Sequence, residues 1–358
     1  MGVLGALRRL LKWIYSLILG AKSATENPFA ETIITAPNGK GRATLIGVGA
    51  TLVELWVPDA KGDLQDVVLG YDDRAQYLDD PAHPVFGRVA GRISNGQFTL
   101  DGKSASTIHG GVLGWDRRTW KRIAYSAHSV TYELVDDAFE GFPGRVTVKA
   151  TYELVDGPEL KMSVTAKTTE RTPLVISNHS YWNLDGHSTP HATSIHDHLL
   201  QIRASRISAL GGLYVPTGEL ASVQGTVHDF TSPRRIGERW SDPALIRDGG
   251  VVGYNDNWIY DERKLSDAAL TLTSPTSGIK MQMFTNQPSV VAYSAIYLND
   301  VPRKGSHVGE MYKPGTGLAI EQQAHADAIN HPEWNVNVVC GPEEEYTWWT
   351  NCRFSIAA

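Results

Sequence analysis

The chain has 358 residues, 42% of them hydrophobic, so it can bury a large core as one big domain or two ordinary ones. Its formal net charge of −6 is modest, and the body of the chain has no long run of Lys and Arg, which argues against nucleic acid as a partner. Only Cys340 and Cys352 are present, which excludes a disulfide scaffold and a cysteine-rich zinc site.

Residues 1–24 form a segment of their own. Apolar residues from Val3 to Ile18 recur at helical spacing opposite Arg8, Arg9 and Lys12, which predicts a short basic amphipathic helix. The same residues resemble a secretory signal peptide, because a basic part precedes an apolar run that is too short to span a bilayer comfortably. We expect either a signal peptide or a helix on a membrane surface, and so favour a secreted or membrane-associated protein over a cytoplasmic one. A purely structural helix is the alternative.

From about Ala43 onward the hydrophobic period is two. Apolar and polar residues alternate between Arg145 and Ala166 on both sides of Asp156-Gly157-Pro158, which predicts a β-hairpin with one buried face. A second hairpin is predicted from Leu270 to Phe284 around the turn Ser274–Gly278. With 34 Gly, 18 Pro and no convincing long helix after residue 24, residues 25–358 are predicted to form one all-β domain, an antiparallel sandwich.

Two distant segments carry the groups best suited to chemistry. His179 lies in NHSYWNL (residues 178–184), and Glu321 is followed by two glutamines; both are surrounded by polar and aromatic residues of the kind that line a sugar pocket. An imidazole and a carboxylate, with ordinary pKa values of about 6.5 and about 4.3, can together open and close a hemiacetal ring near neutral pH. Taken alone, His179 is better explained as a hydrogen-bonded core histidine, and Glu321 as a solvated strand end.

Several further motifs follow one another in a fixed order. They are GRVAGRISNG (Gly87–Gly96), HGG (His109–Gly111), GWDRRTW (Gly114–Trp120), NHSYWNL, PTGE (Pro216–Glu219), Glu321 and DAINHPEW (Asp327–Trp334). This order resembles that of the aldose 1-epimerases, also called galactose mutarotases, over nearly the whole chain. The resemblance implies a single large β-sandwich with an active site in an open cleft on one sheet. It also implies interconversion of the α and β anomers of a hexose, with a small aldose sugar as the partner.

The resemblance also assigns roles to individual residues. His179 matches the general acid that gives a proton to the ring oxygen, and Glu321 matches the general base that takes the anomeric hydroxyl proton. His109 matches a second active-site histidine that supports charge at the ring oxygen. No metal or other cofactor is implied. The residues expected to bind the sugar are Arg92, Asn255, Asp256 and Trp182; Trp115, Trp120 and Trp334 are not placed near the ligand.

Three positions depart from the family pattern. Gly91 stands where an Asn usually precedes the binding arginine, and Val291 stands where a sugar-contacting Gln is common. In GYNDNW (Gly253–Trp258), strict alignment places Asn255 at the sugar-binding Asp and Asp256 one place later, so either residue can be the ligand. All three departures concern binding rather than proton transfer. We therefore expect the chemistry to be retained and the sugar preference to differ.

A histidine-rich stretch offers a different interpretation. His187, His191, His196 and His198 superficially provide metal ligands, but no cysteine or clear carboxylate partner completes a known spacing. We expect a polar loop there and no metal site.

Two alternative functions remain open. One is an epimerase for a phosphorylated or unusual sugar, which would need extra cations in the cleft; Arg92, Arg117 and Arg118 are the candidates. The other is a carbohydrate-binding protein without turnover. The paired presence of His179 and Glu321 argues against the second, because a binding protein does not need a matched acid and base.

Overall fold

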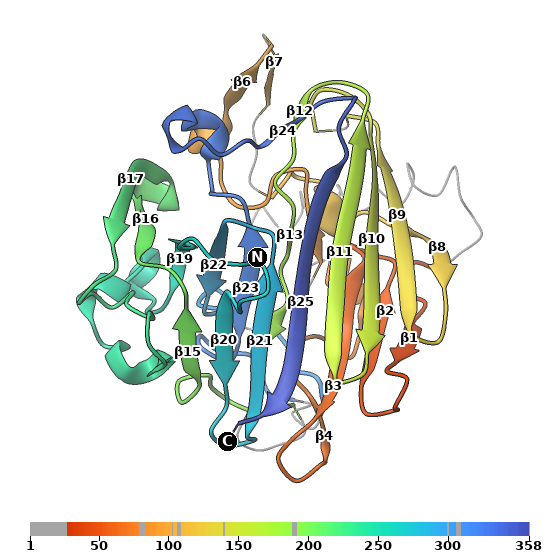
Figure 1. Cartoon of the computed structure of the whole chain (residues 1–358), viewed down its shortest axis with the longest axis vertical. Coiled ribbons are helices and arrows are strands. Elements are labelled where there is room, and N and C mark those ends of the chain that lie inside the picture. The colour runs from red at the N-terminus through yellow and green to blue at the C-terminus, as the bar shows by residue number, and fades with distance from the viewer. Residues whose placement is uncertain are drawn as a thin grey trace.

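Figure 1 shows the computed structural model of the protein, which describes residues 27–78, 84–101, 103–105, 109–138, 140–187, 192–298, 301–305 and 309–357. The helix expected within residues 1–24 lies outside the described residues, as does His191. Within the described ranges, no helix has the length and apolar character needed to cross a membrane.

A nine-stranded sheet forms one layer of the molecule. Its long central strands stand side by side in Figure 1. Both predicted hairpins are confirmed within it, since β10 pairs with β11 and β20 pairs with β21, each antiparallel. In spatial order the strands are β18 (Arg234–Arg235), β15 (Leu199–Ile202), β20 (Leu270–Thr273), β21 (Ile279–Thr285), β25 (Tyr346–Ile356), β11 (Glu159–Thr168), β10 (Val146–Val155), β9 (Ser129–Asp136) and β8 (Lys121–Tyr125).

Two smaller sheets lie on the other side of the core. One has six strands, in the order β14 (Tyr181–Trp182), β23 (Leu318–Gln323), β22 (Ser289–Tyr293), β19 (Asn255–Ile259), β16 (Arg206–Leu210) and β17 (Pro216–Ser222). The other has four, β1 (Thr32–Thr35), β2 (Arg42–Ile46), β3 (Thr51–Pro58) and β4 (Leu64–Asp66).

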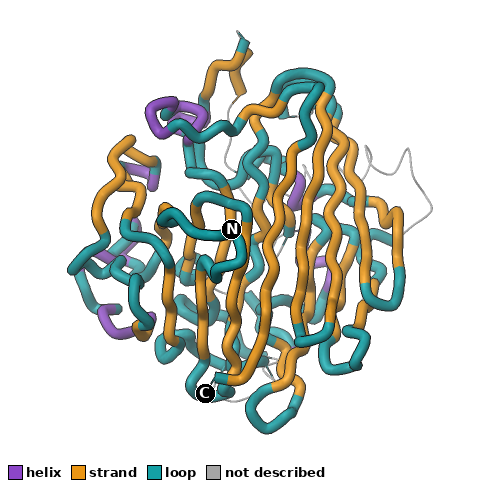
Figure 2. The backbone as a smooth tube through the Cα atoms, viewed as in Figure 1, coloured by secondary structure: helices purple, strands orange, loops and turns teal. Residues whose placement is uncertain are grey.

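Short strand pairs and single helical turns complete the described chain, and Figure 2 shows how strands and loops dominate it. The pairs are β12 (Thr172–Pro173) with β24 (Val339–Cys340), β13 (Ser177–Asn178) with β5 (Val85–Phe86), and β6 (Phe98–Leu100) with β7 (Lys103–Ala105). The 3-10 turns are η1 (Arg74–Leu78), η2 (Ser94–Gly96), η3 (Trp115–Arg117), η4 (Gly212–Tyr214), η5 (Ile236–Arg239), η6 (Pro243–Leu245), η7 (Asp248–Gly250), η9 (Ala328–Asn330) and η10 (Pro332–Trp334).

One continuous hydrophobic core joins these layers. Val148 of the nine-stranded sheet, Leu55 of the four-stranded sheet and Ile320 of the six-stranded sheet all belong to it, and each is at most 3% exposed. Alternating side chains on each strand supply this core because successive residues of a strand point to opposite faces. The predicted antiparallel sandwich is therefore confirmed, and the outer face of the six-stranded sheet is left available for a site.

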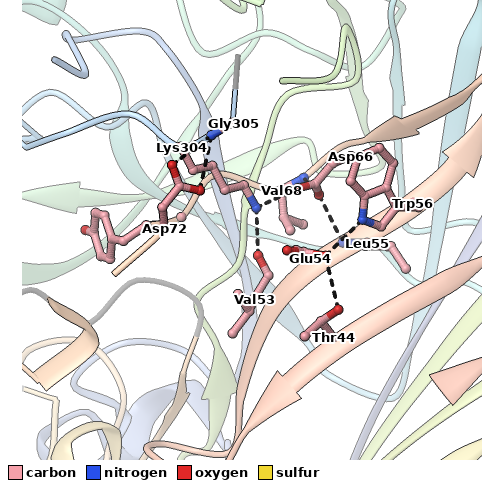
Figure 3. A network of polar contacts seen from close by, with 12 residues as sticks. Thr44, Val53, Glu54, Leu55, Trp56, Asp66, Val68, Asp72, Lys304 and Gly305 are labelled. Carbon is pink, nitrogen blue, oxygen red and sulfur yellow. Dashed lines mark hydrogen bonds and ion pairs between the residues drawn. The ribbon is translucent and has the colours of Figure 1, made fainter. Parts of the chain in front are cut away.

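A buried ion pair ties the loop around Lys304 to the four-stranded sheet (Figure 3). Nζ of Lys304 lies 2.7 Å from Oδ2 of Asp66 and donates to the carbonyl of Val53 at 2.7 Å. Both charged side chains are no more than 5% exposed. The next residue, Gly305, donates its amide to the carboxylate of Asp72 at 3.2 Å. Segments that are far apart in the sequence are thus held together by charge-assisted hydrogen bonds.

This ion pair gives a prediction about stability. Lys304→Met leaves Asp66 buried without its counter-charge, and breaking a buried pair in this way typically costs about 3–5 kcal/mol. Lys161→Met is the matched control, because Lys161 and Glu153 are 4.0 Å apart on an exposed surface; its loss should cost below about 1 kcal/mol. Urea unfolding measures both, and equal losses for the two variants would contradict the assigned role of Lys304.

Candidate active site

A cavity of about 390 Å³ opens on the outer face of the six-stranded sheet. This volume lies within the range of about 300–1,000 Å³ that is typical of small-molecule sites. The cavity is lined by residues from β14, β19, β22 and β23 and by the loops around Gly91 and His109. The predicted cleft on one sheet therefore has a counterpart in the structure.

Strand alternation decides which side chains reach this cavity. Cross-strand register aligns Asn257 of β19 with Val291 of β22 and Glu321 of β23, and all three line the cavity. Their neighbours Trp258, Ala292 and Ile320 belong to the hydrophobic core on the opposite face of the same sheet. Glu321 is thus held by a central strand, paired on both sides, whose backbone cannot shift without disturbing its neighbours.

His179 and Glu321 meet in the cavity wall. Nε2 of His179 lies 3.3 Å from Oε1 of Glu321, and the two side chains are only 8% and 4% exposed. The imidazole packs edge-on against Phe86 and Tyr181, each with a centroid separation of 4.8 Å. The backbone amide of His179 donates to the carbonyl of Pro84 at 3.1 Å, which fixes the start of the side chain. Two groups expected to act together are therefore in direct contact.

Burial changes the protonation of this pair. It raises the pKa of Glu321 to about 8, although the nearby Arg92 guanidinium acts in the opposite direction. It also lowers the pKa of His179 to about 4. Both shifts have the same cause, since removal from water penalises the charged form of each group. Near neutral pH both side chains are therefore neutral, a protonated carboxyl group beside an imidazole.

His109 is held by the backbone of Gly91. The amide of Gly91 donates to Nδ1 of His109 at 3.1 Å, and the amide of His109 donates to the carbonyl of Gly91 at 3.0 Å. Burial, assisted by nearby His179 and two arginines, lowers the pKa of His109 to about 3. A neutral ring whose Nδ1 accepts a hydrogen bond carries its proton on Nε2. His109 is therefore prepared as a hydrogen-bond donor, and its ring stacks on Phe86 at 4.2 Å.

Asn255 and Asp256 both line the cavity, but the register of β19 gives them different neighbours. Asp256 aligns with Ala292 on the core side of β22, and its Oδ2 lies 2.5 Å from Nη2 of Arg247 and 3.5 Å from Nε2 of His228. Asn255 aligns with Tyr293, which lines the cavity. Of the two alternatives, the geometry favours Asn255 as the sugar ligand, because the Asp256 carboxylate is committed to Arg247.

Trp182 does not line the cavity. It is 1% exposed, belongs to the hydrophobic core and packs against Phe354 with ring centroids 6.2 Å apart. The reason is again strand alternation: Tyr181 precedes it on β14 and takes the cavity side, so Trp182 must point inward. We therefore no longer expect a contact between Trp182 and the ligand. Trp115 and Trp120 are core residues as well.

Aromatic and amide side chains that the sequence analysis did not select complete the wall. Tyr181 and Tyr293 face each other across β14, β23 and β22 with ring centroids 6.0 Å apart, and both line the cavity. Asn257 donates to the carbonyl of Val290 at 3.1 Å and accepts from the amide of Ala326 at 3.3 Å, which ties β19 to the loop after β23. Residues two apart in an extended segment point to the same side, so the position of Tyr181 two residues after His179 indicates that it also faces the cavity.

The structure also locates the departures at Gly91 and Val291. Both line the cavity. Gly91 has a φ of +73°, and a Cβ at this position would lie 3.3 Å from Nε2 of Gln323. A side chain here would thus be strained by the backbone and crowded by the glutamine. Val291 places an apolar group beside Glu321, which strengthens the desolvation of the carboxyl.

Two histidines of the histidine-rich stretch, His187 and His198, are buried. Nε2 of His198 accepts the amide of Leu184 at 3.0 Å, and the ring of His196 packs at a tilt against Trp240 with centroids 4.1 Å apart. No group of three or more His, Cys, Asp or Glu side chains within the described ranges is arranged to hold a metal ion. These histidines pack against the fold instead.

Comparisons with known proteins agree with this geometry. A family model for aldose 1-epimerase matches residues 32–353. Galactose mutarotase from Bos taurus is 34% identical over 326 residues, covering 88% of this chain and 92% of that protein. Aldose 1-epimerase from Escherichia coli (strain K12) is 29% identical, covering 90% of this chain and 94% of its own length. The solved structure of a GalM/aldose epimerase homologue from C. elegans matches with a TM-score of 0.83 and 27% identity, over 92% of this chain and 99% of that one. The chain therefore belongs to the aldose 1-epimerase family.

Proposed function

We propose that the protein interconverts the α and β anomers of an aldose by opening and reclosing the sugar ring. One observation carries this proposal: a histidine and a carboxyl group lie 3.3 Å apart, buried, in the wall of a cavity of small-molecule size. The relatives named as galactose mutarotase and aldose 1-epimerase support the same reaction.

The reaction needs one proton donor and one proton acceptor at the anomeric centre. The base removes the proton of the C1 hydroxyl while the acid protonates the ring oxygen, and the bond between C1 and the ring oxygen breaks to give the open-chain aldehyde. Rotation about the C1–C2 bond exposes the other face of the aldehyde. The reverse proton transfers then close the ring as the opposite anomer. No proton is gained or lost, and no cofactor takes part in these steps.

The His179–Glu321 pair contains the one proton that this cycle requires. Before proton transfer the carboxyl group of Glu321 carries this proton, whereas the family assignment has Glu321 as base and His179 as acid. Transfer of the proton across the 3.3 Å contact produces that charged form, a carboxylate beside an imidazolium. The positive charge of Arg92 favours the carboxylate. We propose that the bound sugar, by bringing hydroxyl donors to Glu321, completes this shift, and that His109 donates from Nε2 to the ring oxygen region.

A binding protein without turnover is less well supported. Burying a carboxyl group and an imidazole against each other has a cost in desolvation that a sugar-binding wall does not require. Catalytic groups, by contrast, commonly have pKa values moved by burial and by a close partner. The neutral pair therefore favours an enzyme over a binding module.

Substitution of either partner tests the proposal. His179→Ala and Glu321→Gln should each lower kcat for anomer exchange by about 10²–10⁴-fold, because a positioned acid or base typically contributes that much. Exchange NMR or polarimetry on galactose and glucose measures the rate. His128→Ala is the control, since His128 is exposed in the turn before β9. Exchange close to the wild-type rate in either variant would remove that residue from the mechanism.

The pH dependence of kcat/KM tests the shared proton. The free enzyme should be active between about pH 4 and about pH 8, the pKa values to which burial moves His179 and Glu321. Below the lower limit both groups carry a proton and no base remains; above the upper limit both have lost it and no acid remains. A fall in kcat/KM beginning near the ordinary histidine value of about 6.5 would contradict the assignment.

A further inference from the structure

Arg92, the arginine expected to bind the sugar, rests against one aromatic ring. It lines the cavity, is half-buried, and makes no hydrogen bond or ion pair with any described residue. The residue before it, Gly91, has no side chain that could support it. The ring of Tyr214 lies with its centroid 5.3 Å from the guanidinium carbon. A cation within about 6 Å of an aromatic ring is attracted by the face of that ring. The Tyr214 ring is therefore the group that can hold the guanidinium in place.

Tyr214 is itself fixed at its hydroxyl end. Its oxygen accepts the backbone amide of Asp248 at 2.8 Å and lies 2.5 Å from the hydroxyl oxygen of Tyr297. The hydroxyl of Tyr297 donates to the carbonyl of Asp248 at 3.5 Å. Because a hydroxyl has one proton, Tyr214 must be the donor between the two tyrosines. These bonds close a ring that ties Tyr214 to two other loops.

The backbone of Tyr214 is constrained as well. Tyr214 ends η4 in the loop between β16 and β17, and Leu210 and Pro216, which flank this loop, also line the cavity. Its φ of +58° lies in the left-handed region that bulky residues rarely adopt. Such a conformation persists only where the surroundings impose it, and it is found most often at functional sites. The loop thus holds a bulky residue in an unfavourable conformation, with its ring against Arg92.

We propose that Tyr214 is a positioning residue that holds Arg92 in the orientation in which it binds sugar hydroxyls. This inference rests on the proposed anomer exchange and on the sugar-binding role expected of Arg92. An arginine without a fixed contact loses side-chain freedom when it binds a ligand, and that loss weakens binding. Contact with Tyr214 orders the guanidinium before the sugar arrives, so its N–H donors meet the hydroxyls at a smaller entropic cost.

Loss of the ring should therefore raise KM and leave kcat almost unchanged, because the contact supports the substrate and the transition state alike. Tyr214→Leu removes the ring, and KM for galactose or glucose should rise about three- to tenfold, while kcat changes by less than about twofold. Tyr214→Phe keeps the ring and should restore KM to within about twofold of the wild-type value. Exchange NMR measures both constants.

Tyr125→Leu is the matched control. Arg122 lies over the ring of Tyr125 at the same 5.3 Å, but both residues are on β8 and neither lines the cavity. This variant should keep the wild-type KM. A wild-type KM in Tyr214→Leu would overturn the inference, and so would a Tyr214→Phe enzyme impaired as strongly as Tyr214→Leu.

A double-mutant cycle tests whether Tyr214 acts through Arg92. In the background of Arg92→Met, which lacks the guanidinium, adding Tyr214→Leu should change KM by less than about twofold. A residue that contacted the sugar itself, or whose loss disturbed the loop in general, would raise KM by the same factor in both backgrounds. That result would show that Tyr214 does not position Arg92.

Binding of a sugar that cannot open its ring separates this inference from the proposed function. Titration calorimetry with methyl galactoside and methyl glucoside should show the same weakening in Tyr214→Leu, about three- to tenfold. If the wild-type enzyme exchanged the anomers of no aldose, the proposed function would fail, and calorimetry would still test Tyr214. If anomer exchange were observed but Tyr214→Leu altered neither KM nor binding, only the role of Tyr214 would fail.

Discussion

The burial of His179 against Glu321 is the constraint on which the site depends. As solvated side chains with ordinary pKa values, the carboxylate would be ionised near neutral pH and the imidazole would be protonated only below about pH 6.5. Removal from water makes both neutral and leaves a single proton between them. The sheet makes this arrangement possible: Glu321 lies on a central strand, while His179 lies between two short strands and is fixed by aromatic rings.

Much of the fold can be predicted from the sequence, and so can several of the residues that line the cavity. The alternation in β10 and β11, and in β20 and β21, is strong enough to predict both hairpins without tertiary information. The resemblance to the aldose 1-epimerases brought His109, His179, Glu321 and Arg92 together, and all four line one cavity. Motifs that follow one another in the family's order identify site residues well, because each residue is recognised from the sequence around it.

The direction in which a side chain points and its protonation state were harder to predict from the sequence. The sequence shows that Trp182 is close to His179, but it does not show which side of a two-residue strand faces the ligand. The choice between Asn255 and Asp256 needed the register of β19 against β22. Reference pKa values gave an ionised Glu321, whereas burial by neighbours that are remote in the sequence, among them Val291, reverses this state. Tertiary packing decides which face of β14 meets the cavity, how β19 aligns with β22, and how deeply Glu321 is buried.

Infrared difference spectroscopy of the carboxyl groups shows directly whether Glu321 carries a proton. The spectrum of the empty wild-type enzyme at neutral pH, minus that of Glu321→Gln, isolates the Glu321 side chain from other buried carboxyl groups such as Asp66 and Asp116. We expect the carbonyl stretch of a protonated carboxyl group, replaced by carboxylate bands as the pH rises through about 8. Carboxylate bands alone at neutral pH would show that Glu321 is ionised in the empty site and would contradict the shared proton.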